Sequence, residues 1–191
     1  MNKEQFYKQL EITLRLIKEV EEITRTEPAT ETRTERRQLI DYFMYKFFEL
    51  YLALRNDPSL KLNSKYKDFI IESQYFLRGL GSEIDRYIGE IEDRLRTTFY
   101  SNEWKEIICP SRSAIEAVKE IYRGTSFEER YEGDDPESLF LDTEDLDDDL
   151  ESFSHKEGYL KEEDIPREIP ASHWWWWSPN EPPNYIREDD E

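Results

Sequence analysis

The stretch from Glu35 to Arg55, ERRQLIDYFMYKFFELYLALR, decides the fold of this 191-residue chain. Its apolar residues recur at intervals of three and four, which is the period of an amphipathic α-helix. Seven of them share one face: Ile40, Phe43, Met44, Phe47, Leu50, Tyr51 and Leu54. Leu39, Phe48 and Leu52 widen that face, so we expect this helix to be the central one, contacted from several sides. Pro58 and the two polar residues before it end the helix.

Two flanking segments repeat the pattern. Residues 3–25 place one apolar stripe on a helix: Phe6, Leu10, Leu14, Ile17 and Val20. Residues 64–100 form the longest periodic segment, and Gly79 and Gly81 interrupt it. Because a glycine inside a helix costs about 1 kcal/mol relative to alanine, we predict a kink or a short break there.

A further helix is predicted to begin at Ser113. Ser113 and Glu116 form an S-x-x-E capping box, and Gly124 stands at the position where a helix commonly ends. A shorter turn of helix precedes it and is predicted to end at Pro110. No strand pattern in this part of the chain opposes the helical interpretation, so the sequence predicts a bundle.

Charge divides the chain after Arg130. Residues 1–130 hold 22 Lys and Arg and 24 Asp and Glu, whereas residues 131–191 hold 4 basic and 21 acidic side chains, a net charge of −17. Low hydrophobicity with high net charge opposes independent folding. We therefore predict an all-α fold with two parts: a bundle of four to five helices in residues 1–130, then a long, acidic and largely irregular C-terminal tail in residues 131–191.

Two parts of the tail are apolar and are the candidate partner-binding residues. Leu146, Leu150 and Phe153 would share one face if their segment became a helix in a partner's groove; the alternative is a solvated segment. The second part is the run WWWW between Pro170 and Pro179, for which the prolines favour an extended backbone with alternating indoles. Its members are Trp174, Trp175, Trp176 and Trp177, and Tyr185 is added beyond them.

Such an apolar run must be covered, because contiguous exposed apolar patches mark interaction sites. The two leading candidates for the surface that buries this run are the chain's own bundle and another protein. Tryptophan is a preferred hot-spot residue in protein interfaces. Sugars, nucleobases and a membrane interface are weaker alternatives, since the surrounding acids repel nucleic acid and anionic head groups.

Enzymatic chemistry is not predicted. Both histidines, His155 and His173, lie in the tail, and Cys109 is interpreted as a packing residue. Nucleotide-binding glycine motifs and Glu-x-x-His pairs are absent from the sequence. Acids near Glu83 are expected to face solvent, and the acidic run 142–151 lacks the glycine of a calcium loop. We therefore predict no catalytic residue, no metal site and no cofactor.

The charge also bears on partners and location. A strongly acidic tail opposes direct binding to nucleic acid, and Arg36 in a small basic cluster is expected to pair with that tail or with Glu31 and Glu35. The N-terminus does not have the form of a signal peptide, and no window has the roughly 20 apolar residues of a membrane helix. We expect a cytoplasmic protein that does not bind membranes.

These observations favour a non-enzymatic adaptor or regulatory subunit. Its acidic, tryptophan-rich tail would hold a protein partner with a basic and apolar surface, and a second copy of the chain is one candidate. Acidic residues would steer that partner and raise the association rate. The alternative is a nucleic-acid mimic or antitoxin-like inhibitor, whose tail would occupy the basic channel of a nucleic-acid-handling enzyme.

Overall fold

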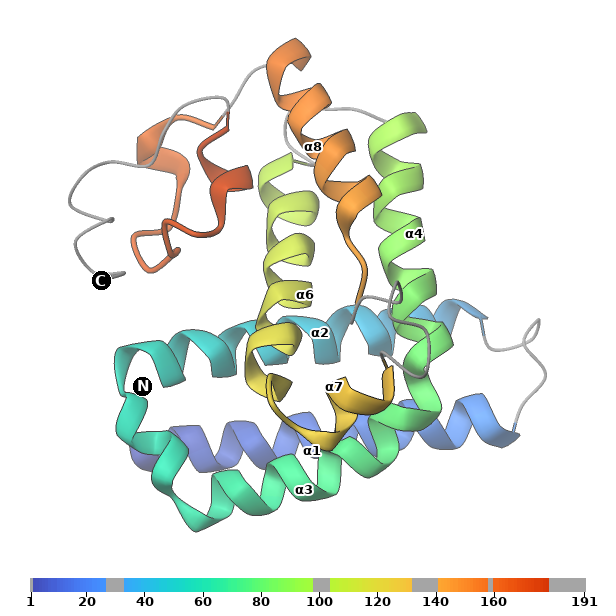
Figure 1. Cartoon of the computed structure of the whole chain (residues 1–191), viewed down its shortest axis with the longest axis vertical. Coiled ribbons are helices and arrows are strands. Elements are labelled where there is room, and N and C mark those ends of the chain that lie inside the picture. Colours follow the sequence, from blue (N-terminus) through green and yellow to red (C-terminus); the bar gives the residue numbers. More distant parts are fainter. Residues whose placement is uncertain (1, 27–32, 98–103, 132–140, 158–159, 179–191) are drawn as a thin grey trace. The chain divides into compact units, whose positions relative to one another are not determined.

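The computed structural model describes most of the chain as helix (Figure 1). The described residues are 2–26, 33–97, 104–131, 141–157 and 160–178. Their regular secondary structure is helical throughout, and no strand occurs in these ranges. The predicted all-α fold is therefore confirmed.

Contacts divide the chain into two compact units. Unit 1 joins Met1–Tyr87 to Ala114–Asp142, and unit 2 joins Ile88–Ser113 to Thr143–Glu191. This grouping differs from the predicted division after Arg130, because residues 88–113 group with the C-terminal third of the chain. Each unit is thus assembled from two separate stretches of sequence.

Unit 1 contains most of the helices. Their bounds are α1 Lys3–Thr26, α2 Arg33–Asn56, the short η1 Pro58–Leu62, α3 Ser64–Leu77, η2 Arg78–Leu80 and α7 Ser126–Tyr131. The helix α4, Gly81–Thr97, begins in this unit, and α6, Cys109–Tyr122, ends in it. The helix α1 packs against both α2 and α3 (Figure 1). The predicted break between Gly79 and Gly81 is confirmed, because η2 separates α3 from α4 at that point.

The core of unit 1 is aromatic, and Phe47 of α2 meets rings from two other helices. Phe47 of α2 lies 6.3 Å from Phe69 of α3 and 5.7 Å from Tyr122 of α6, measured between ring centroids. Tyr122 in turn meets Phe127 of α7 edge to face at 5.4 Å. The Tyr122 hydroxyl has a hydrogen bond of 2.6 Å with Ser73, so its polar end is satisfied inside the core.

A buried ion pair links α2 to α4 and corrects one expectation. Arg36 and Glu83 are each 4% exposed, and Arg36 Nη1 lies 3.0 Å from Glu83 Oε1. Glu83 therefore faces the interior rather than solvent, and Arg36 pairs with it. The second carboxylate oxygen of Glu83 accepts a hydrogen bond from Arg86 at 2.8 Å. Burial is tolerated because both charges are paired and hydrogen-bonded.

Unit 2 contains the rest of the elements. They are the π-helical turn η3 Trp104–Ile108, the first residues of α6, the helix α8 Glu144–Glu157, and the short turns η4 Glu162–Asp164 and η5 Trp174–Trp176. The start of α6 differs from the prediction. The helix begins at Cys109, so Pro110 stands in its first turn, where a missing N–H costs no hydrogen bond. Ser113 is consequently an interior residue of α6 and not a cap.

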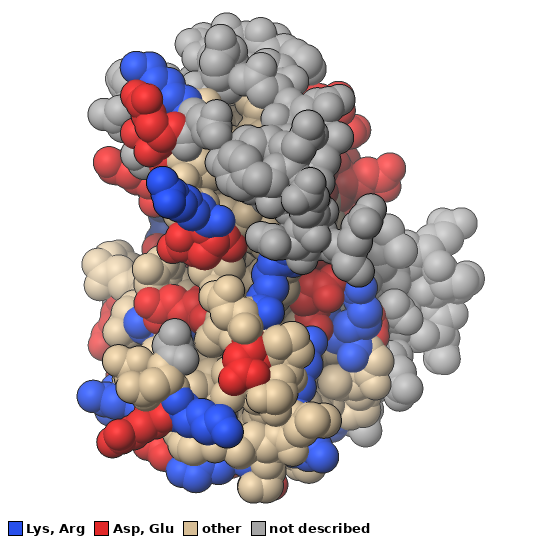
Figure 2. All heavy atoms as spheres, turned by 90° about the vertical axis from the view of Figure 1, so that its left-hand side faces the viewer, with Lys and Arg blue, Asp and Glu red and all other residues tan. Residues whose placement is uncertain are grey.

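Surface charge is mixed on the face of the molecule in Figure 2. Described Lys and Arg side chains lie among Asp and Glu side chains there, and the two signs do not separate into large patches. This agrees with the near balance of basic and acidic residues in the first 130 positions.

Candidate functional site

The acidic segment after residue 141 is a helix whose apolar side faces its own chain. Leu146 and Leu150 are both 0% exposed, and Phe153 is partly exposed. The predicted helical face is thus present in α8. Its two leucines are covered within the chain itself, so they are not available to a partner while this arrangement holds.

Two ion pairs fix α8 to its neighbours within unit 2. The buried Arg112 of α6 donates two parallel hydrogen bonds to Asp147, from Nε at 2.7 Å and from Nη2 at 2.9 Å. Arg96 of α4 donates from Nε to Asp149 at 2.7 Å. Charge-assisted bonds of the bidentate kind are among the strong ones in proteins. Arg112 also donates to the Thr143 hydroxyl at 3.2 Å, just before α8 begins.

Four other acids of α8 are exposed and form the acidic face of α8: Glu144, Asp145, Asp148 and Glu151. Three of these, at i, i+4 and i+7, lie along one row of the helix. Burial raises the pKa of the nearby Glu92 carboxyl; Arg96 opposes this, and the charges of Asp145 and Asp149 add to it. The acids of this region are therefore crowded enough to repel one another.

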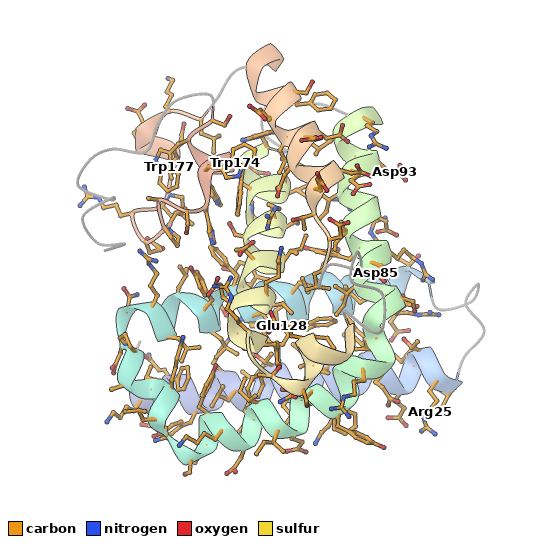
Figure 3. The ribbon with its side chains drawn as sticks, in the orientation of Figure 1. Arg25, Asp85, Asp93, Glu128, Trp174 and Trp177 are labelled. Carbon is orange, nitrogen blue, oxygen red and sulfur yellow. The ribbon has the colours of Figure 1, made fainter. Side chains whose placement is uncertain are left out.

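The tryptophan run is a helical turn and not the extended segment that we predicted. Trp176 N–H donates to the His173 carbonyl at 3.1 Å, and Trp177 N–H donates to that of Trp174 at 2.9 Å. Pro170 and Pro179 lie outside this turn, so neither removes an N–H that it needs. Figure 3 labels Trp174 and Trp177, the two ends of the run. Trp174 is partly exposed, and the other three indoles are buried.

The hydroxyl of Ser113 contacts three side chains of the tryptophan segment. It accepts hydrogen bonds from Trp175 Nε1 at 3.2 Å and from Trp176 Nε1 at 2.8 Å. It also lies 2.9 Å from His173 Nδ1. Because a hydroxyl has two acceptor lone pairs and one proton, both lone pairs are used by the indoles and the proton goes to Nδ1. This pattern requires an imidazole whose Nδ1 carries no proton.

Arg112 connects the tryptophan segment to α8. Its guanidinium carbon lies 4.3 Å from the centroid of the Trp175 ring, and the His173 ring stacks on Trp175 at 4.8 Å. Trp175 also donates to the Cys109 carbonyl at 3.2 Å. One arginine therefore contacts both apolar parts of the tail, through Asp147 and through the indole face.

The predicted partner-binding residues thus have different environments. Leu146, Leu150, Trp175, Trp176 and Trp177 are buried, with exposed fractions of 0 to 4%. Phe153 and Trp174 are partly exposed, and Tyr185 lies outside the described residues. The Trp177 Nε1 atom is buried and has no hydrogen-bond acceptor among the residues that the structure describes.

Sequence reasoning missed the grouping of Cys109, Ser113 and His173. These residues have the types of a nucleophile and a base, yet each is 0% exposed. Burial raises the pKa of the Cys109 thiol well above its usual value, which is opposite to what activates a nucleophile. Cys109 and Ser113 share a helix face by their spacing, but nothing in the sequence indicates that a histidine 60 residues later joins them.

Among the described residues, no group of three or more His, Cys, Asp or Glu side chains is placed to hold a metal ion. None of the described helices has both the length and the apolar character needed to cross a membrane. In comparisons with known proteins, no family model, no curated protein and no solved structure matches the chain.

Proposed function

We propose that the protein is a non-enzymatic adaptor or regulatory subunit that binds a protein partner through the acidic face of α8. The partner would present a basic surface, with apolar groups where Phe153 and Trp174 remain partly exposed. In this proposal the buried leucines and indoles do not contact the partner. They hold α8 in place so that its acids are presented on a fixed helix.

One observation carries the proposal: two acids of α8 pair with arginines of its own unit, and four others are exposed on one side of the helix. Asp147 and Asp149 are bound to arginines of the same unit. Glu144, Asp145, Asp148 and Glu151 face solvent, opposite the buried leucines. Fixed, like-charged groups on one face attract a complementary surface and raise the association rate at low salt. The burial of Cys109, Ser113 and His173 supports the non-enzymatic part of the proposal.

The test uses substitutions on the acidic face of α8 and leaves the ion-paired acids unchanged. The variant Asp145→Asn/Asp148→Asn/Glu151→Gln removes three charges from the face, and Glu4→Gln/Glu19→Gln/Glu35→Gln removes three exposed charges from unit 1. Full-length chains would serve as bait, and the association rate of any captured protein would then be measured at low and high salt. We expect the α8 variant to slow association at low salt by about tenfold or more, with a much smaller effect at high salt.

The outcome of the unit 1 variant decides the interpretation. A partner that both variants lose equally would be responding to net charge alone, and the proposal would be wrong. Deleting residues 131–191 is a poorer test, because the deletion also removes Asp147 and the indoles that cover Ser113. Loss of binding would then report unfolding of unit 2 as readily as loss of the acidic face.

The second candidate is the nucleic-acid mimic, which the spacing of the exposed acids favours. Residues four and three apart on a helix are separated by about 6 Å and about 4.5 Å along its axis, so Glu144, Asp148 and Glu151 form a row of closely spaced negative charges. A mimic would be displaced from its target by duplex DNA or single-stranded RNA in proportion to added nucleic acid. An adaptor partner would stay bound under the same titration at constant salt.

A further inference from the structure

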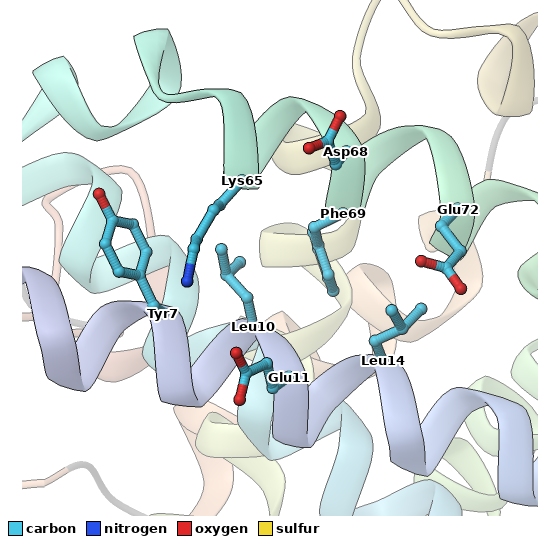
Figure 4. A pocket seen from close by; sticks show the side chains of 8 residues that line it. All are labelled: Tyr7, Leu10, Glu11, Leu14, Lys65, Asp68, Phe69 and Glu72. Atoms are coloured by element: carbon cyan, nitrogen blue, oxygen red, sulfur yellow. The ribbon is translucent and has the colours of Figure 1, made fainter.

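A groove in unit 1 lies between α1 and α3 and has a volume of about 210 Å³. Its floor is apolar and is formed by Leu10 and Leu14 of α1 and Phe69 of α3 (Figure 4). Leu10 is 4% exposed and Phe69 is 3% exposed, so the floor is continuous with the core. The groove is far from the tail in sequence and has no part in the function proposed above.

Lys65 lines one end of this groove and Glu72 lines the other. At one end, the Lys65 ammonium lies 4.6 Å from the centroid of the Tyr7 ring, and Asn63 donates to the Tyr7 hydroxyl at 2.5 Å. At the other end, Lys18 pairs with Glu72 at 2.5 Å. Each end is thus closed by a pair of side chains from the two helices.

Two carboxylates line the groove, one from each helix, and that of Asp68 is directed away from α1 in Figure 4. Glu11 comes from α1 and Asp68 from α3, and Leu10 and Phe69 lie between them in Figure 4. No ion pair or hydrogen bond from a described residue reaches either side chain. A carboxylate next to apolar surface interacts more strongly with a cation than one in bulk water does, because the local dielectric constant is lower.

We propose that this groove binds one arginine or lysine side chain from a peptide segment of a partner protein. The aliphatic stem would lie on Leu10, Leu14 and Phe69, and the charged head would pair with Glu11, while Asp68 on the other side adds to the negative potential of the groove. The volume supports a single side chain, since sites for small molecules usually enclose about 300–1,000 Å³.

The surface beside the groove favours a peptide over a free organic cation. Ile71 and Tyr75 of α3 are 71% and 72% exposed, and they stand three and seven residues after Asp68. This spacing places them on the turns of α3 next to that carboxylate. Two large apolar side chains beside a charged groove would contact residues that flank the inserted side chain, which a free cation lacks.

The test is a titration of the isotopically labelled full-length chain, followed by nuclear magnetic resonance. The probes are acetyl-Leu-Arg-Leu-amide and the same peptide with citrulline, which has nearly the same shape and no charge. We expect the arginine peptide to shift the amides of residues 7–14 and 65–75 and to bind about tenfold more tightly than the citrulline peptide. Equal affinities for the two peptides would overturn the proposal.

Two matched variants and one free cation locate the interaction. Glu11→Gln/Asp68→Asn should weaken binding of the arginine peptide about tenfold, while Glu4→Gln/Glu19→Gln, also exposed and on α1, should leave it within about twofold. Agmatine alone should bind more weakly than the peptide. Agmatine binding as tightly would assign the groove to a free cation and refute the peptide. Shifts confined to α8 would place the binding on the acidic face instead.

Discussion

Replacing Ser113 by alanine tests whether one hydroxyl holds the tryptophan segment in place. Trp175 keeps its hydrogen bond to the Cys109 carbonyl at 3.2 Å, but the bonds of Ser113 to Trp176 Nε1 and His173 Nδ1 are lost. A buried polar group that loses its hydrogen bond costs about 1–3 kcal/mol. Two such groups predict a decrease in the free energy of unfolding of unit 2 of roughly 2–6 kcal/mol.

The assay follows from the distribution of the tryptophans. All 5 tryptophans of the chain, Trp104 and Trp174 to Trp177, belong to unit 2. Tryptophan fluorescence during urea unfolding therefore reports on unit 2, and far-ultraviolet circular dichroism reports on both units. We expect Ser113→Ala to lower the fluorescence midpoint well below the midpoint of the wild type.

Ser111→Ala is the matched control for this prediction. Ser111 lies two residues earlier on α6, is partly exposed, and should change the stability by less than about 0.5 kcal/mol. Equal fluorescence midpoints for Ser113→Ala and Ser111→Ala would refute the reasoning. The hydroxyl would then contribute no more than a surface serine, and burial of the indoles alone would hold the segment.

Three further predictions address the ion pair, the thiol and a buried phenol. Arg36→Met leaves Glu83 buried with only Arg86 and should lower the free energy of unfolding by about 3–5 kcal/mol. Lys46→Met, at the more exposed pair with Glu49, should lower it by less than about 1 kcal/mol. Urea unfolding followed by circular dichroism measures both variants. At neutral pH the Cys109 thiol should react with Ellman's reagent only after urea is added, because it is buried and its pKa is raised, and fast reaction of the native chain would contradict its burial. Burial raises the pKa of Tyr66 from 10.0 to about 12. Its contribution to stability is therefore full below pH 10.0 and is lost as the pH rises toward about 12, a decrease of about 3 kcal/mol at about 1.4 kcal/mol per pKa unit. Alkaline unfolding of Tyr66→Phe should lack this part of the decrease.

The sequence predicted the parts of the fold that depend on local pattern. The stripe of Phe43 and Phe47 indicates a central helix, and the two glycines around Leu80 indicate the break between α3 and α4. The shared face of Leu146 and Leu150 was also predictable, since residues four apart on a helix point the same way. In each case the deciding residues lie within a few turns of one another.

The candidate site depends on contacts that no local pattern encodes. Ser113 meets the indole of Trp176 across 63 residues, and Arg36 meets Glu83 across 47. The serine fits a capping box equally well by its spacing, so its interior position and its role with the tryptophans could not be predicted. The prolines around the tryptophan run also indicated an extended backbone. Only the hydrogen bonds of the helical turn show that both prolines lie outside it.

The contacts of unit 2 form late during synthesis, because they join residues that lie far apart in the sequence. Cys109 and Ser113 are made 66 and 60 residues before their partners Trp175 and His173. At about 5–20 residues per second, this interval lasts roughly 3–13 s. Throughout it, the start of α6 has emerged without the indoles that cover it, while the helices α1, α2 and α3 already have their own contacts. A ribosome that stalls late in the message would therefore release a chain whose first unit is assembled and whose second unit presents bare apolar surface to any chaperone or protease nearby.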